Sequence, residues 1–152
     1  MPMRIRVAGQ TDPGQLREMN EDSFYYKIME ASDEEPVGLF IVADGMGGHL
    51  AGEVASMWAV EALKWELSLL FQPRDPRATL QLTGEERHAT FTGERTTKPL
   101  AETEIQRLIR VAIERANSVV SGYARKKPDK AEGMGSTVTL AVVEQGLATI
   151  AN

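Results

Sequence analysis

The stretch that decides the organisation of the chain is Val37-Gly-Leu-Phe-Ile-Val-Ala-Asp-Gly-Met-Gly-Gly48. Residues 37–43 are wholly apolar, and the polar turn residues 33–36 precede them. A short apolar run bounded by turn signals predicts a β-strand that is covered on both faces. Asp44 follows at once and opens a glycine-rich turn. The sequence therefore places a carboxylate at the tip of a buried strand.

Further strands are predicted on both sides of this run. Residues 3–7 alternate between apolar and basic side chains, which is the pattern of a half-buried strand. Residues 23–29 are rich in aromatic side chains and predict a second strand. Near the end of the chain, residues 137–143 alternate and are β-branched, and Gly146 separates them from a last strand at 147–151.

Helical spacing of apolar residues predicts one helix over about 54–70 and another over about 104–124. Between them lies a polar stretch, residues 72–99, whose charges nearly cancel. A connection of this length is uncommon in a compact domain, so it is either a mobile insertion or has local structure of its own.

Composition narrows the function classes. The chain has 152 residues, 17 Lys and Arg against 22 Asp and Glu, a net charge of -5 and no cysteine. This length predicts one domain, residues 1–152, and the acidic balance argues against nucleic acid as the main partner. Without cysteine there is no disulfide, thiolate metal site or cysteine nucleophile. No apolar run is long enough to cross a membrane and the N-terminus lacks a secretory pattern, so we expect a cytoplasmic protein.

Two acidic positions are candidates for metal binding. Asp44 is a natural ligand for a hard cation, and Gly45 allows a turn sharp enough for its own carbonyl to join the coordination shell. The alternative is that this Asp-Gly pair is only a turn. Glu21 and Asp22 lie just before a predicted strand and close in sequence to Arg17. Taken alone, they also fit a surface loop with an internal ion pair, which would add little stability.

In combination, these motifs resemble the metal-dependent protein phosphatases of the PPM/PP2C family, bacterial type. The resemblance rests on Arg17-Glu-Met-Asn-Glu-Asp22, on Val42-Ala-Asp-Gly-Met-Gly-Gly-His49 with Gly52-Glu-Val-Ala-Ser56 after it, and on Gly133-Met-Gly-Ser-Thr-Val138. The motifs follow the family's order and cover nearly all of the chain except residues 72–99.

The resemblance implies an α+β fold, the α-β-β-α sandwich of two antiparallel sheets flanked by helices, present here in part. It also implies hydrolysis of phosphoserine and phosphothreonine by a water activated between two Mn²⁺ or Mg²⁺ ions. By analogy, Asp44 would bridge the ions and Gly45 would give one of them its carbonyl oxygen. Glu21, the stronger candidate, and Asp22 would hold metal-bound waters, and Arg17 would grip the substrate phosphate as a guanidinium fork.

The chain departs from the family pattern in two respects. Many eukaryotic relatives have a histidine directly after the Asp-Gly pair, where this chain has Met46, as is common in bacterial members. We read His49 as a turn or helix-start residue and His88 as loop surface. Further metal-binding aspartates of the family lie beyond the point that corresponds to Asn152. We therefore expect this chain to be the N-terminal part of one phosphatase domain, with part of the metal site and little activity alone.

The partners implied are phosphoprotein substrates, on which the phosphatase would oppose a Ser/Thr kinase in signalling, with no nucleic acid and no membrane. Two other interpretations stay open from the sequence. One is a non-catalytic, phosphatase-like module that binds or regulates a partner without turnover. The other is a soluble α/β domain whose acidic turns bind nothing. Under the resemblance to the phosphatases, residues 133–137 have a structural role: the glycines make a turn, and Ser136 and Thr137 start the core strand that follows.

Overall fold

The computed structural model describes residues 4–15, 19–30, 35–48, 51–71, 102–131 and 133–152. Within them, the strands β1 (Asp22–Met29), β2 (Val37–Met46), β4 (Thr139–Glu144) and β5 (Leu147–Ala151) form an antiparallel sheet in the order β1-β2-β4-β5. A short strand, β3 (Gly135–Ser136), pairs with the end of β2. The predicted strands at 23–29, 37–43 and 147–151 are thus confirmed with small changes of boundary.

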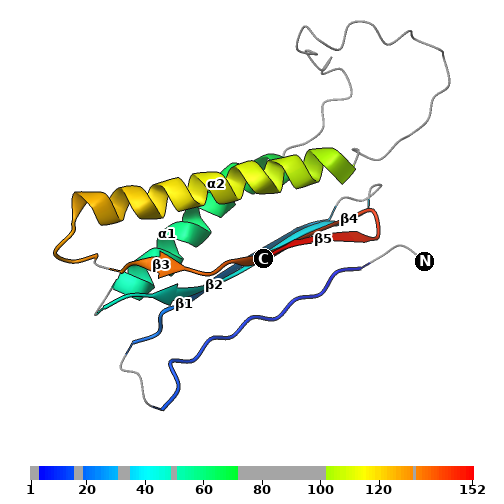
Figure 1. The fold of residues 1–152 in the computed structure, drawn as a ribbon. Coiled ribbons are helices and arrows are strands. Elements are labelled where there is room, and N and C mark those ends of the chain that lie inside the picture. Colours follow the sequence, from blue (N-terminus) through cyan, green and yellow to red (C-terminus); the bar gives the residue numbers. More distant parts are fainter. Residues whose placement is uncertain (1–3, 16–18, 31–34, 49–50, 72–101, 132) are drawn as a thin grey trace, which may run out of the picture.

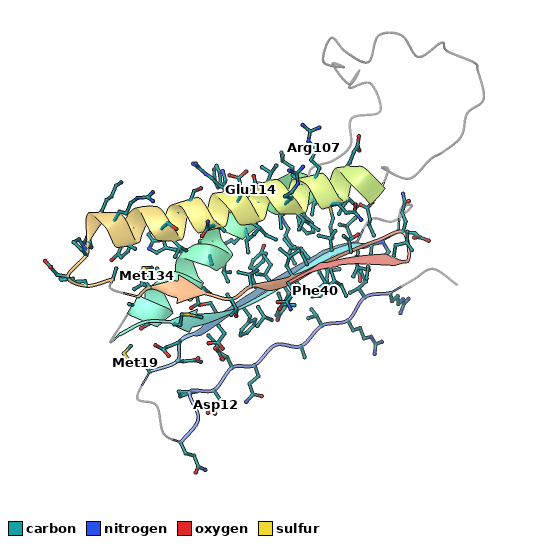
Figure 2. The ribbon with its side chains drawn as sticks, viewed as in Figure 1. Asp12, Met19, Phe40, Arg107, Glu114 and Met134 are labelled. Atoms are coloured by element: carbon teal, nitrogen blue, oxygen red, sulfur yellow. The ribbon has the colours of Figure 1, made fainter. Side chains whose placement is uncertain are left out.

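Both predicted helices are present, and they lie on one face of the sheet (Figure 1). Helix α1 (Ala51–Glu66) continues into a 3₁₀ turn, η1 (Leu67–Phe71), and packs directly on β1 and β2. Helix α2 (Glu102–Lys126) packs mainly on α1. Its outer side carries Arg107 and Glu114, which point away from the sheet (Figure 2). No helix in the described part of the chain has the length and apolar character that a membrane span requires.

The core lies between the helices and this face of the sheet. Alternate residues of β2 and β4 point into it, because successive side chains of a strand face opposite sides. The buried apolar side chains that form it are Leu39, Ile41, Ala43, Val60, Leu63, Leu67, Ile105, Ile109, Ala112, Ala116, Leu140 and Val142. The stripe of α2 that faces inward is the one that its helical spacing predicts.

The opposite face of the sheet, which we call the open face, carries large apolar side chains that remain exposed among the described residues. Phe24 is 38% exposed, Val42 57% and Ile150 68%, and Phe40 points to the same side (Figure 2). The prediction that residues 37–43 form a strand covered on both faces is therefore wrong for the part of the chain that is described. In the described residues, helices cover one face of the sheet and leave the other without helical cover.

The predicted strand at 3–7 is also wrong. Residues 4–7 alternate between exposed and half-buried side chains as expected, but no described strand pairs with them. The segment instead runs across the open face without joining the ladder (Figure 1), and Gly9 lies against the ring of Phe24. Alternation in sequence reports on burial, whereas a strand also requires a hydrogen-bonded neighbour.

The strand predicted at 137–143 is present as β4, which begins two residues later, and the short strand β3 precedes it; both pair with β2 in one register. Met46 is opposite Gly135 and Gly38 is opposite Val143, which is the same pairing continued along β2. The chain between them therefore runs alongside Asp44. After β4, Gln145 and Gly146 both have positive φ, 50° and 75°, so they form the two-residue type I′ turn of a tight hairpin.

Candidate metal site

Two carboxylates meet at one end of the sheet. In the register of β1 and β2, Asp22 lies directly opposite Asp44, and both residues are exposed. Side chains of directly opposite residues project from the same face with their Cβ atoms roughly 4.5–5.5 Å apart. This is the open face, away from the helices. Like charges so placed repel each other, and a cation between them would offset that repulsion.

The peptide that joins Asp44 to Gly45 is hydrogen-bonded on both sides. The N–H of Gly45 donates to the carbonyl oxygen of Glu21 at 3.0 Å. On the other side, the carbonyl oxygen of Asp44 accepts from the N–H of Thr137 at 2.9 Å and lies 3.1 Å from the Ser136 hydroxyl. Since the N–H and C=O of one strand residue point to the same neighbour, the Gly45 carbonyl is directed toward the β1 side, where Asp22 lies.

Gly45 is required at this position by the start of α1. A Cβ atom at Gly45 would lie 1.9 Å from the carbonyl oxygen of Gly52, so no other residue fits. A Cβ at Gly52 would in turn lie 2.5 Å from Oε1 of Glu21. The Glu21 carboxylate is thus packed against the first turn of α1, where the helix dipole favours negative charge.

The two predicted water-binding carboxylates therefore lie differently. Asp22 projects from the open face beside Asp44, whereas the half-buried Glu21 lies against Gly52 of α1. Their roles toward metal-bound water stay predictions. Of the two, Asp22 is the residue that lies directly opposite Asp44 in the register of β1 and β2.

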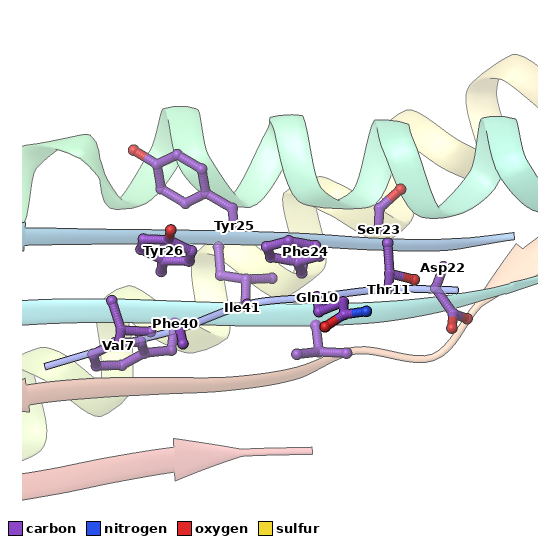
Figure 3. A pocket seen from close by; sticks show the side chains of 13 residues that line it. Val7, Gln10, Thr11, Asp22, Ser23, Phe24, Tyr25, Tyr26, Phe40 and Ile41 are labelled. Carbon is purple, nitrogen blue, oxygen red and sulfur yellow. The ribbon is translucent and has the colours of Figure 1, made fainter. Parts of the chain in front are cut away.

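A pair of hydroxyl groups on the core side of β1 joins the start of this strand to α1. Ser23, the neighbour of Asp22, points toward α1 (Figure 3), and its Oγ lies 3.0 Å from the Oγ of Ser56. Ser56 is fully buried, and its hydroxyl also lies 3.1 Å from the carbonyl oxygen of Glu53. The hydrogen bond between Ser23 and Ser56 holds the start of β1 against α1 on the core face of the sheet, while Asp22 projects from the open face.

A cavity of about 340 Å³ lies on the open face beside Asp22 (Figure 3). The N-terminal segment forms one wall with Val7 and Thr11, and Asp22 and Phe24 lie on the other. Asn20 joins the two walls, because its side-chain amide donates to the hydroxyl of Thr11 at 2.8 Å and its Oδ1 accepts from the N–H of Asp22 at 3.0 Å. These two hydrogen bonds tie the N-terminal segment to the start of β1 near Asp22.

The donors brought together fit a hard divalent cation. Asp22, Asp44 and the Gly45 carbonyl offer only oxygen atoms, the ligands that Mg²⁺ and Mn²⁺ prefer. Among the described residues there is no group of three or more His, Cys, Asp or Glu side chains that could hold a metal ion. Arg17, His49, His88 and the 72–99 stretch lie outside the described residues, and the predictions made for them stay predictions.

Sequence reasoning missed the part that Ser136 and Thr137 have in the site. It assigned them to the start of a core strand, whereas both contact the backbone of Asp44. The contact joins residues 92 positions apart in the chain. The shared register of β3 and β4 along β2 is what brings them together, and only correct strand pairing could have revealed it.

Comparison with known proteins agrees with this geometry. The family described as Protein phosphatase 2C matches residues 16–152. The serine/threonine phosphatase stp of Listeria monocytogenes is 34% identical over 145 residues, which cover 94% of this chain and 44% of that protein. The serine/threonine protein phosphatase PstP of Mycobacterium tuberculosis is 30% identical over 135 residues, 89% of this chain and 18% of that protein.

Solved structures give the same result. The crystal structure of the M. tuberculosis serine/threonine phosphatase PstP/Ppp matches with a TM-score of 0.60 at 27% identity, over 95% of this chain and 45% of that one. The catalytic domain of PstP in complex with 2 manganese ions matches with a TM-score of 0.55 at 26% identity, over 97% of this chain and 54% of that one. The chain thus spans about half the length of these relatives or less. The α+β fold predicted from the motifs is confirmed, and the chain belongs to the protein phosphatase 2C family.

Proposed function

We propose that this chain is the N-terminal part of a single catalytic domain, residues 1–152 included, of a metal-dependent protein serine/threonine phosphatase. The observation that carries the proposal is the placement of Asp22 opposite Asp44 at the exposed end of β1 and β2. The names of the relatives, serine/threonine phosphatases in Listeria and Mycobacterium, support the reaction class.

The cofactor proposed is Mn²⁺ or Mg²⁺, two ions in a complete site. Asp44 would bridge them, Gly45 would contribute its carbonyl oxygen, and Glu21 and Asp22 would hold metal-bound waters. When bound, such ions lower the pKa of a water nucleophile and neutralise charge that develops on a phosphoryl group. The manganese ions in the PstP catalytic domain support this choice of metals.

The proposed substrates are phosphoserine and phosphothreonine side chains of proteins phosphorylated by a Ser/Thr kinase in the cytoplasm. Arg17 would bind the phosphate, because a guanidinium group presents paired donors that match phosphate oxygens. Because Arg17 is only five residues before Asp22 in the sequence, a phosphate bound by Arg17 would lie near the carboxylates of Asp22 and Asp44.

The test compares Asp44→Asn with Asp129→Asn, which changes an exposed aspartate in the turn after α2. In the natural protein that contains this chain, Asp44→Asn should lower Mn²⁺-dependent hydrolysis of p-nitrophenyl phosphate by more than about 100-fold, beyond the usual loss for residues that only support a ligand. Asp129→Asn should leave the rate unchanged. Near-normal turnover by Asp44→Asn would refute the proposal. Binding of phosphopeptides with no turnover by the unaltered protein would instead identify a non-catalytic module.

A further inference from the structure

We infer that Ser136 is a positioning residue of the metal site: its hydroxyl fixes the Asp44–Gly45 peptide and thereby the direction of both predicted metal ligands. The inference rests on the proposed function, since it concerns the same site. It assigns a role to a side chain that touches neither metal nor substrate, and it depends on the hydrogen bonds around one peptide group.

The first step is the position of that peptide between the two predicted ligands. The Asp44 carboxylate leaves the chain just before it, and the Gly45 carbonyl lies just after it. A rotation of this peptide plane would therefore turn the carboxylate and the carbonyl relative to each other. A divalent ion bound by both needs oxygen distances defined to a few tenths of an ångström.

The second step is the number of bonds that resist such a rotation. The N–H of Gly45 is bonded to Glu21 at 3.0 Å on the β1 side. On the far side, the carbonyl oxygen of Asp44 receives the Thr137 N–H at 2.9 Å and has the Ser136 Oγ at 3.1 Å. A carbonyl oxygen has two lone pairs, so it can accept both donors at once.

The third step is the need for a side-chain donor at this place. Residues 137 and 138 belong to neither β3 nor β4, so the ladder along β2 is interrupted beside Asp44. Thr137 supplies a backbone bond there, and its own hydroxyl is 3.5 Å from the Asp44 oxygen, too far for a strong bond. The Ser136 hydroxyl is the closer side-chain donor to the Asp44 oxygen. Its single proton lies between that oxygen at 3.1 Å and the carbonyl oxygen of Thr137 at 2.8 Å, so the hydroxyl bridges the two backbone carbonyls where the ladder is interrupted.

The experiment measures the Mn²⁺ affinity of the natural protein that contains the 152-residue chain by calorimetry. Ser136→Ala removes the hydroxyl and Ser136→Thr keeps it. The matched control is Ser118→Ala, because the Ser118 hydroxyl also donates to a backbone carbonyl, that of Glu114 at 2.9 Å, but on the exposed side of α2. We expect Ser136→Ala to weaken Mn²⁺ binding by about tenfold, Ser136→Thr to restore it, and Ser118→Ala to leave it unchanged.

A second measurement does not need the metal. In the metal-free protein, amide hydrogen exchange at Gly45 should be several-fold faster in Ser136→Ala than in the unaltered protein, while exchange at Phe40, in the middle of β2, should not change. A role only in overall stability would speed exchange at both positions. Ser136→Cys, a weak donor of similar size, serves as a second variant and should give intermediate affinity.

Each outcome decides the inference. Mn²⁺ affinity within twofold of the unaltered protein in Ser136→Ala or Ser136→Cys, or unchanged exchange at Gly45, would overturn it. If Asp44→Asn abolishes Mn²⁺ binding while Ser136→Ala does not weaken it, the inference fails and the proposed function stands. If the unaltered natural protein binds no Mn²⁺ at millimolar concentration, the positioning role and the proposed metal site are both overturned.

Discussion

Gly45 and Gly52 touch backbone to backbone, so the end of β2 and the first turn of α1 approach as closely as two peptide chains can. A Cβ on Gly45 would meet the Gly52 carbonyl oxygen at 1.9 Å, and one on Gly52 would meet Oε1 of Glu21 at 2.5 Å and the carbonyl carbon of Gly45 at 3.1 Å. The contact sets the distance between the helix and the carboxylate at the strand end. It also leaves no room for a side chain at either position.

The first prediction concerns Gly52→Ala. Because the new methyl group must displace both Glu21 and the backbone of Gly45, we expect a loss of about 1–3 kcal/mol in the free energy of unfolding, measured by urea denaturation. Gly122→Ala is the matched control, since a Cβ on this α2 residue meets nothing within 4 Å. It should stabilise the chain by about 0.5–1 kcal/mol. Equal effects of the two variants would contradict the close contact.

The second prediction concerns the repulsion between Asp22 and Asp44. Without metal, Asp22→Asn should raise the free energy of unfolding by about 0.2–1 kcal/mol, because one of two like charges opposite each other is removed. With Mn²⁺ present, the unaltered chain should become more stable than Asp22→Asn, because a bound ion stabilises the folded state and the variant has lost one carboxylate that would help to bind it. Thermal unfolding in a chelator and in Mn²⁺ measures both effects. Asp129→Asn should change neither, and a variant less stable than the parent in chelator would disprove the repulsion.

The third prediction concerns the hydroxyl pair of Ser23 and Ser56. Each single alanine variant should cost about 0.5–1.5 kcal/mol of unfolding free energy, the usual net value of one hydrogen bond. The double variant should cost less than the sum of the two, because the shared bond is lost only once. A double-mutant cycle by urea denaturation measures this coupling. Strict additivity would mean that the hydroxyls do not bond to each other.

The fourth prediction concerns the hairpin turn between β4 and β5. Gln145 has φ of 50°, a conformation that asparagine adopts more readily than glutamine. Gln145→Asn should therefore stabilise the chain by about 0.5–1 kcal/mol. Gln145→Val should destabilise it, because a β-branched residue is strained at positive φ. If both variants had the same melting temperature, the turn could not be of type I′.

The elements of the fold could largely be predicted from local pattern. The apolar run before Asp44, the aromatic strand before it and the apolar stripe of α2 each carry their own periodicity, which depends only on neighbours in sequence. The strand expected at residues 3–7 failed because alternation does not specify a partner. Coverage of both faces of β2 failed for a similar reason, since apolar composition does not say which elements will pack on a face.

The candidate site divides in the same way. Asp44, Gly45, Glu21 and Asp22 could be named because they occur in short motifs that carry a resemblance to a family. The pairing of Asp22 with Asp44, the packing of Glu21 on Gly52 and the contact of Ser136 with the Asp44 carbonyl could not. Each depends on strand register or on helix placement, which join residues distant in sequence.

Ala43, Asp44 and Gly45 point alternately to the core, to the open face and to the core again. Insertion or deletion of a single residue in the middle of β2 would exchange these directions and drive a carboxylate among Leu39 and Ile41 while an alanine took its place outside. Substitutions on the open face do not change which side of the sheet each residue of β2 points to. Length variation among natural or engineered versions of this strand should consequently be confined to the loops at its two ends.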